Sequence, residues 1–175
     1  MNEDTFLIRP ETDADRTAIA HVHRLAFGGE AEAGLVEAVR GSDGFIPGLS
    51  LVAEYGGQMI GHILLSRIHI ETGEGSVDAL SLAPLAVLPG YQRQGVGSAL
   101  VRRALEEARR QGHAAVLVLG HADYYPRFGF SAGKAAGVAC PFGDAGPHWM
   151  ALELVSGALE GVRGRAVYPP AFYGV

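Results

Sequence analysis

The sequence has 175 residues and a formal net charge of −5, with 48% hydrophobic and 19% charged residues. We expect one domain, residues 1–175, because this length and apolar content are sufficient for a hydrophobic core. An acidic chain is a poor candidate for non-specific nucleic-acid binding, which depends on clustered Lys and Arg, so a small-molecule or peptide partner is expected.

The first forty residues predict one short strand and two helices. Residues 5–9 (TFLIR) are typical of a short strand. Thr12 or Asp13 can cap a helix that continues to about Ala26, because the side-chain oxygens of these residues accept hydrogen bonds from the free amides of a first helical turn. A second pattern of helical periodicity covers residues 31–40.

Three long strands are predicted next, in an antiparallel meander. They cover residues 51–55, 59–69 and 77–87. Gly56 and Gly57 join the first strand to the second, and such a glycine pair is typical of a tight hairpin turn. A glycine-containing loop at residues 73–75 joins the second strand to the third.

An amphipathic helix over residues 95–111 and a buried strand over 113–119 complete the central region. The apolar residues of the helix recur at the spacing of one face. They are Val96, Leu100, Ala104, Leu105 and Ala108. The strand (HAAVLVL) is almost wholly apolar, so we expect it to be covered on both faces and to lie parallel to the strand at 77–87.

The last third of the chain is less regular. A short helix is expected at residues 123–128 and a further strand at 147–155. Residues 156–175 are rich in Gly and Pro, so we expect a C-terminal tail that wraps the domain, with a short strand near Val167.

The turn before the central helix reads Gln92-Arg93-Gln94-Gly95-Val96-Gly97, and its glycines lie where they weaken a helix. A helix N-terminus has unpaired N–H groups and a partial positive charge, so it can bind an anion. Gly95 and Gly97 have no Cβ to keep a phosphate away from these amides, and Arg93 adds charge. The pattern predicts a diphosphate site; the alternative is a tight turn that merely needs glycine.

Two separated motifs resemble those of the GNAT-type N-acetyltransferases. The turn described above fits Gln/Arg-x-x-Gly-x-Gly/Ala, and Tyr125 to Phe130 (YPRFGF) fits Tyr-x-x-x-Gly-Phe. The segments LAPLAVLPGYQRQGVGSAL, ADYYPRFGF and MALEL…GVRGRAVYPPAF are similar to the YhbS-like acetyltransferases, and the resemblance covers nearly the whole chain. It implies a GNAT-type α/β fold, with a mixed, splayed central sheet of about six to seven strands and helices on both faces.

The resemblance implies an N-acetyltransferase that moves an acetyl group from acetyl-CoA, or another acyl group from its CoA ester, to a primary amine. The amine would attack directly in a ternary complex, without a metal. The turn amides would hold the diphosphate, and the end of the strand at 77–87 would pair with the pantetheine amides and polarise the thioester carbonyl. The implied cofactor-binding residues are Leu85, Ala86, Val87, Gln92, Arg93, Gln94, Gly95, Val96, Gly97 and Ser98.

Tyr125 matches the general acid of many family members and would protonate the departing thiolate, although a packed pocket-wall tyrosine is the alternative. Many relatives have a Glu base where this chain has Ser81, which is no base unaided and would at most order a water. Other candidate bases are His23, Glu32, Glu54 and His62. His62 is more simply explained as a half-buried, hydrogen-bonded residue. An amine with a low or lowered pKa needs no dedicated base.

Two other functions are kept open. The missing acid at Ser81 allows a non-catalytic acyl-CoA-binding sensor or regulatory module, and the turn could hold a different phosphate-bearing ligand. His121 stands where YhbS-like sequences often carry an acid, a departure that would change what the acceptor meets.

The single cysteine, Cys140, excludes a disulfide framework and a multi-Cys metal site. The polar, acidic N-terminus and the lack of a long apolar run predict a cytoplasmic protein without a membrane partner. The acceptor, as well as the choice between monomer and homodimer, is left open.

Overall fold

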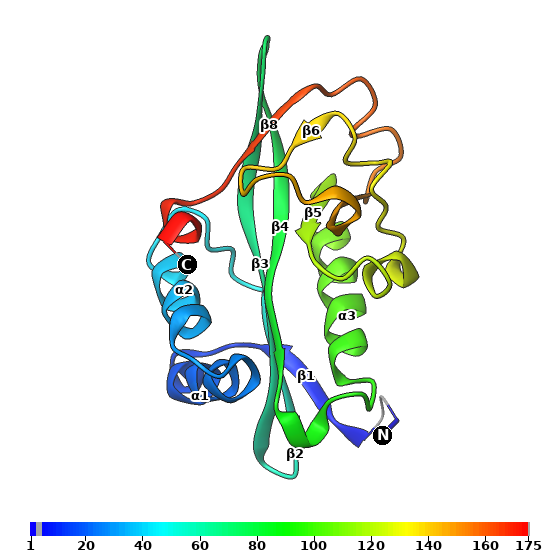
Figure 1. The fold of residues 1–175 in the computed structure, drawn as a ribbon. Coiled ribbons are helices and arrows are strands. Elements are labelled where there is room, and N and C mark those ends of the chain that lie inside the picture. The colour runs from blue at the N-terminus through cyan, green and yellow to red at the C-terminus, as the bar shows by residue number, and fades with distance from the viewer. Residues whose placement is uncertain (3–4, 175) are drawn as a thin grey trace.

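The computed structural model describes residues 1–2 and 5–174, which form eight strands of one mixed sheet and three α-helices (Figure 1). The strands are β1 (Leu7–Pro10), β2 (Ser50–Tyr55), β3 (Gln58–Thr72), β4 (Gly75–Val87), β5 (Ala115–Leu119), β6 (Val138–Ala139), β7 (Trp149–Glu153) and β8 (Gly164–Val167). The helices are α1 (Arg16–Phe27), α2 (Ala31–Arg40) and α3 (Val96–Arg110). The short 3₁₀ turns are η2 (Asp13–Asp15), η3 (Pro89–Tyr91), η4 (Tyr125–Phe128), η5 (Gly146–His148) and η6 (Pro170–Gly174).

The sheet has the strand order β1-β2-β3-β4-β5-β7, with β8 beside β3 and β6 beside β8. Strands β1 to β4 pair antiparallel, as the predicted meander requires. Strands β4 and β5 are parallel because α3 carries the chain back between them. The predicted mixed sheet is therefore confirmed. Strand β6, with two residues, was not indicated by the sequence and brings the described strands to one more than expected.

Helices cover both faces of the sheet, as expected. Helices α1 and α2 lie on one side of β3 and β4, and α3 lies on the other (Figure 1). A Cβ at Gly61 of β3 would lie 3.0 Å from Leu100 and 3.2 Å from Val96 of α3. The missing side chain thus lets α3 approach the sheet closely. On the opposite face, His62 of β3 contacts His23 of α1.

Strands β4 and β5 separate after a short paired section. Their parallel register covers only Leu80 with Val116 and Ser81 with Leu117. Beyond these pairs β4 continues to Val87 while still paired with β3. The last part of β4 therefore has no strand partner on its β5 side among the described residues. This is the splay that the resemblance implied, and it positions the site described below.

Helix α1 begins later than the capping pattern predicts, because the residues before it form η2. The Asp15 carboxylate accepts a hydrogen bond of 2.7 Å from the Thr12 N–H and bonds of 2.7 and 2.9 Å from the Arg9 guanidinium. These contacts close a tight turn, so regular helix starts only after it. The Arg9 guanidinium also holds the pKa of Asp15 well below its usual range.

The end of the chain returns to the sheet. The expected strand near Val167 is β8, which pairs antiparallel with the far part of β3. The turn η6 then contacts α2. The C-terminal turn therefore lies on the α1–α2 side of the sheet (Figure 1). Among the described residues, no helix combines the length and the apolar character needed to cross a bilayer.

Candidate active site

The turn before α3 has free backbone donors. Two of its residues, Arg93 and Gly95, have positive φ angles of 61° and 90°, and Gly95 is the N-cap of α3. Among the described residues, the backbone N–H groups from Arg93 to Ser98 have no hydrogen-bond acceptor. Left-handed residues in such a turn make successive amides converge, which forms an anion-binding concavity.

Two side chains of the turn are engaged in hydrogen bonds to the backbone, while a third has no such partner among the described residues. The amide nitrogen of Gln92 donates to the carbonyl of Val87 at 2.9 Å, and that of Gln94 donates to the carbonyl of Gly90 at 3.1 Å. These glutamines brace the turn with their side chains. Arg93 is exposed and has no ion-pair partner within the described part of the chain. It is therefore the side chain of the turn that is available to an anion.

Both glycines also have a local structural reason. The φ of Gly95 lies in the left-handed region that side chains disfavour. A Cβ at Gly97 would lie 3.3 Å from the Tyr124 hydroxyl and 3.6 Å from Val87. The tight-turn explanation therefore applies as well as the anion-site explanation. Every helix N-terminus leaves its first amides free, so the observation that favours an anion site is that the amides of Arg93 and Gln94, before the helix, are free as well within the described part of the chain.

The open edge of β4 presents alternate backbone groups. The carbonyl of Val87 accepts the Gln92 side chain and so points away from β3. Inward and outward groups alternate along an antiparallel strand, so the backbone of Leu85 points the same way, while that of Ala86 points toward His62 on β3. Of the three predicted residues, Leu85 and Val87 are the two whose backbone faces the splay.

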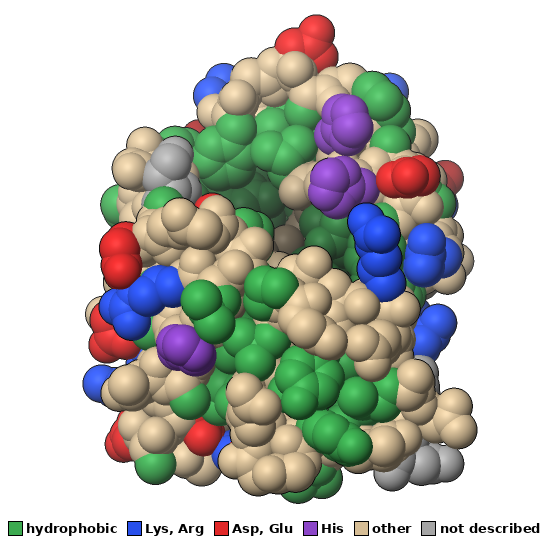
Figure 2. Space-filling view, turned by 60° about the horizontal axis from the view of Figure 1, so that its bottom comes forward, with side chains coloured by type: hydrophobic (Ala, Val, Ile, Leu, Met, Phe, Trp, Pro, Cys, Tyr) green, Lys and Arg blue, Asp and Glu red, His purple; other side chains and the backbone are tan. Residues whose placement is uncertain are grey.

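A pocket of about 540 Å³ lies where β4 and β5 separate. Its walls come from α1 and α2, from β4, from the end of β5 with η4, and from the C-terminal third. The lining residues are Phe27, Glu32 and Leu35, then Leu82 to Leu85, then Leu119 to His121 with Tyr125, and finally Phe142, Tyr168 and Phe172. Figure 2 shows this face hollowed between hydrophobic side chains, with histidine side chains on one rim.

Tyr125 is held in this pocket by its neighbours. A Cβ at Gly120 would lie 2.3 Å from the Tyr125 ring, so the ring lies directly on the backbone at the end of β5. The rings of Tyr124 and Phe130 pack edge-on against it, with centroids 5.1 and 5.7 Å away. Burial, and then the neighbouring Tyr124, raise the pKa of Tyr125 above its ordinary value. The phenol is therefore neutral, and burial makes it a weaker acid than an exposed tyrosine.

Ser81 lies beneath the pocket wall, not on it. Its side chain is fully buried, and neither its hydroxyl nor that of Ser66, directly opposite on β3, has a hydrogen-bond partner among the described residues. Tyr168 is also buried, which raises its pKa, and the nearby Ser81 hydroxyl offsets part of this rise. These three hydroxyl groups form a small polar cluster under an otherwise apolar surface.

The candidate bases separate into two groups. Glu32 lines the pocket, as does His121. Glu54 instead accepts a hydrogen bond of 2.6 Å from Arg9. His23 and His62 are completely buried and hydrogen-bonded to each other, so His62 is more buried than the sequence suggested. Neither histidine lines the pocket.

The C-terminal wall of the pocket was not found by sequence reasoning. Phe142, Tyr168 and Phe172 belong to a region that reads as irregular, and no motif marks them as a group. The aromatic residues of the tail segment YPPAFY were a signal, but only the packing of the tail on the sheet gives them this position.

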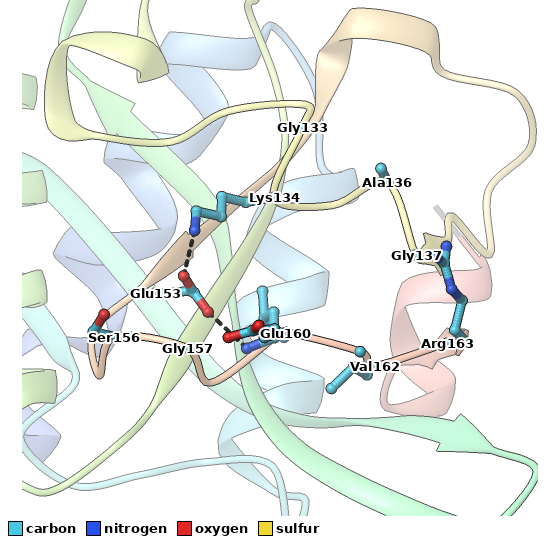
Figure 3. A pocket seen from close by; sticks show the side chains of 12 residues that line it. Gly133, Lys134, Ala136, Gly137, Glu153, Ser156, Gly157, Glu160, Val162 and Arg163 are labelled. Atoms are coloured by element: carbon cyan, nitrogen blue, oxygen red, sulfur yellow. Dashed lines mark hydrogen bonds and ion pairs between the residues drawn. The ribbon is translucent and has the colours of Figure 1, made fainter.

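A second hollow, of about 370 Å³, lies near β6 and β7 (Figure 3). Lys134 and Glu153 form an ion pair of 2.5 Å in it, and the Leu159 N–H donates to the same carboxylate at 2.8 Å. Arg163 lies on the opposite side of the hollow in Figure 3. Since the lysine and carboxylate are already paired and no predicted site residue lines this hollow, the splay remains the candidate site.

The fold is that of an acetyltransferase of the GNAT class, and the comparison with protein families agrees. The family described as the Acetyltransferase (GNAT) domain matches residues 7–133. The chain belongs to this family of N-acetyltransferases.

Particular relatives lie close in sequence. The chain is 45% identical to the uncharacterized N-acetyltransferase YjhQ of Escherichia coli over 129 residues, 72% of this chain and 68% of YjhQ. It is 35% identical to the uncharacterized N-acetyltransferase YhbS of Escherichia coli over 168 residues, 95% of this chain and 98% of YhbS.

Two solved structures are similar over nearly the whole chain. The crystal structure of Escherichia coli YhbS in complex with CoA has a TM-score of 0.88 and 31% identity, covering 97% of this chain and 92% of that one. A GNAT-family acetyltransferase from Brucella melitensis in complex with acetyl-CoA has a TM-score of 0.77 and 30% identity, covering 95% and 97%.

Proposed function

We propose that the protein transfers an acetyl group from acetyl-CoA to a primary amine, by direct attack of the amine on the thioester in a ternary complex. The observation that carries this proposal is the row of unpaired amides from Arg93 to Ser98 beside the splayed strands. A diphosphate is the ligand that suits such a row at a helix N-terminus. The related proteins solved with CoA and acetyl-CoA support the choice of donor.

The rest of the donor would follow the open edge of β4. The backbone groups of Leu85 and the N–H of Val87, which face the splay, would pair with the pantetheine amides, which need hydrogen-bond partners once removed from water. A free N–H at this edge would also polarise the thioester carbonyl. We take residues 1–175 to act as one acyltransferase unit, which the pairing of the tail strand β8 with β3 supports.

Tyr125 would serve as the general acid. The amine nitrogen forms a bond to the thioester carbon, the carbon–sulfur bond breaks, and the thiolate takes the hydroxyl proton of Tyr125. The position of Tyr125 in the pocket and the absence of a hydrogen-bond partner for its hydroxyl within the described residues support this role.

The incoming amine must also lose its proton. Among the candidate bases named from the sequence, Glu32 is the one that lines the pocket, so it is the candidate to accept this proton. Ser81 keeps the role of ordering a water, since a buried hydroxyl without a partner is costly and a water would satisfy it. An amine whose pKa is lowered by desolvation would need neither group.

The test combines binding with turnover. Isothermal titration with CoA, dephospho-CoA and NAD measures which ligand the turn selects, and release of free CoA from acetyl-CoA is followed across a panel of amines. We expect CoA binding together with amine-dependent release above background hydrolysis. CoA binding without acceptor-dependent turnover would favour the sensor or regulatory module. Binding of NAD that is stronger than binding of CoA would mean that the turn holds a different phosphate-bearing ligand.

A further inference from the structure

The acceptor side of the pocket is unusually aromatic. The ring centroids of Phe142 and Tyr168 are 4.9 Å apart, and those of Tyr168 and Phe172 are 5.0 Å apart, both in edge-to-face geometry. Phe27 of α1 lies on another wall. Phe27 and Phe142 are 47% and 40% exposed. Exposed aromatic side chains that converge on one hollow are typical of a surface that receives an apolar ligand.

The charged side chains of the pocket also indicate which acceptor it suits. Among the described residues that line it there is no Lys or Arg; Glu32 supplies its carboxylate and His121 an imidazole. Glu32 has no hydrogen bond or ion pair with any described residue. Glu30, two residues earlier, is instead paired with Arg24 at 2.7 Å. A half-buried carboxylate without a partner, beside aromatic faces, suits one positive charge.

This lining disfavours several kinds of amine. An amino acid or other carboxylate-bearing acceptor would bring a negative charge to a pocket without a Lys or Arg to meet it. A polyamine or an aminoglycoside carries several positive charges, and one carboxylate pairs with one of them. An amine on an apolar ring, by contrast, matches both the aromatic wall and the single carboxylate.

Most of the aromatic wall lies beyond the residues matched by the GNAT domain. The match to the GNAT domain covers residues 7–133, which include the turn before α3, the edge of β4 and Tyr125. Phe142, Tyr168 and Phe172 lie beyond it. The part of the pocket that would bind the donor therefore lies within the matched GNAT domain, while the aromatic wall is supplied by the C-terminal third, which is included in the similarity to YhbS.

We propose that the acceptor is an arylalkylamine, whose ring lies against the wall formed by Phe142 and Tyr168 while its ammonium pairs with Glu32. This inference rests on the proposed acetyltransferase function and specifies its substrate class. Binding the ring would bury aromatic surface against existing rings, and the ammonium would stay paired until it loses its proton for attack.

A panel of acceptors tests the inference directly. The panel contains 2-phenylethylamine, L-phenylalanine, ethylamine, spermidine and a terminally blocked lysine peptide, each with acetyl-CoA. Phenylalanine adds only a carboxylate to 2-phenylethylamine, and ethylamine removes only the ring. We expect kcat/KM for 2-phenylethylamine to exceed that of every other member by about ten-fold or more. A preference for spermidine or the lysine peptide, or equal use of phenylalanine, would overturn the substrate class and leave the proposed function intact.

Two variants test the named residues. Glu32→Gln should raise KM for 2-phenylethylamine about ten-fold without changing KM for acetyl-CoA, while Glu30→Gln, whose carboxylate is paired elsewhere, should change neither. Phe142→Ala should weaken the use of 2-phenylethylamine and leave ethylamine unaffected. Equal effects of the two glutamate substitutions would contradict the assignment of Glu32.

A binding measurement separates this inference from the proposed function. If no amine is acetylated, the proposed function fails. Titration of the protein with 2-phenylethylamine, with and without CoA, still measures whether the pocket binds an arylalkylamine. We expect saturable binding that Glu32→Gln weakens about ten-fold. No detectable binding of this amine in either condition would overturn the inference.

Discussion

The Nε2 atom of His23 in α1 lies 2.8 Å from the Nδ1 atom of His62 in β3, and neither side chain is exposed. The Nε2 atom of His62 lies 2.8 Å from the hydroxyl of Ser50, which donates its own proton to Glu11. A hydroxyl that donates to a carboxylate accepts from its other partner, so both histidines carry their protons on Nε2. Arg40 pairs with Glu11 at 2.8 Å. The chain holds two neutral imidazoles between helix and sheet.

This pair predicts that stability falls in acid. Burial lowers the pKa of His23 to about 4 and that of His62 well below 6.5. Between about pH 6.5 and 4 the unfolded chain binds protons that the folded protein does not, so lowering the pH through this window favours unfolding. The expected loss is about 1.4 kcal/mol per pH unit for each histidine. Urea unfolding at pH 7.5, 6.0 and 5.0 measures it.

The control for this prediction uses an exposed histidine. His23→Gln should reduce the pH dependence of the free energy of unfolding, while His21→Gln, at an exposed position of α1, should leave it unchanged. A pH dependence that is the same in both variants would show that the buried pair does not control acid stability.

Tyr125→Phe should lower kcat by a factor of about 10²–10³, because it removes the proton donor for the thiolate. KM for acetyl-CoA should change little, since the ring and its packing remain. The matched control is Tyr91→Phe, which removes a hydroxyl whose contact with Gln58 is long, at 3.4 Å. Steady-state kinetics with one amine measure both variants. A normal kcat for Tyr125→Phe would show that Tyr125 packs in the pocket wall and is not the general acid.

Gly97→Ala should weaken the binding of acetyl-CoA. The new methyl group would lie 3.3 Å from the Tyr124 hydroxyl and beside the free amides, where it would obstruct the diphosphate. We expect KM for acetyl-CoA to rise by about ten-fold or more. Gly90→Ala in η3, just before this turn, meets open space and should leave KM as it is. An identical KM for acetyl-CoA in the two variants would show that the glycine at position 97 is needed for the backbone turn and not for binding the diphosphate.

Gly120→Ala should damage both stability and activity. A Cβ there would lie 2.3 Å from the Tyr125 ring, so the ring must move. The expected cost is about 1–3 kcal/mol in the free energy of unfolding, together with a lower kcat. Gly73→Ala, which meets no atom within 4 Å, is the control. Thermal unfolding and kinetics on the same preparations measure the two effects, and an unchanged kcat would show that the position of Tyr125 does not limit the reaction.

The sequence indicated the elements whose signals are local. The glycine pair at Gly56 and Gly57 predicted the hairpin between β2 and β3, and the apolar face of residues 95–111 predicted α3 to within one residue at each end. The start of α1 was less accurate, because Arg9 and Asp15 build a turn there through a contact that periodicity does not encode. The two GNAT motifs likewise depend on residues close together in the chain.

The sequence by itself determined the fold class, the turn before α3 and the family, because each of these depends on spacings of a few residues. Only the tertiary structure decided that Glu32 and Tyr125 share a pocket with Phe142 and Tyr168, and that His23 meets His62 in the core. Such pairs are distant along the chain, and their contact depends on how the helices and the tail pack on one sheet. No local pattern carries that information, since packing is a property of the whole folded chain.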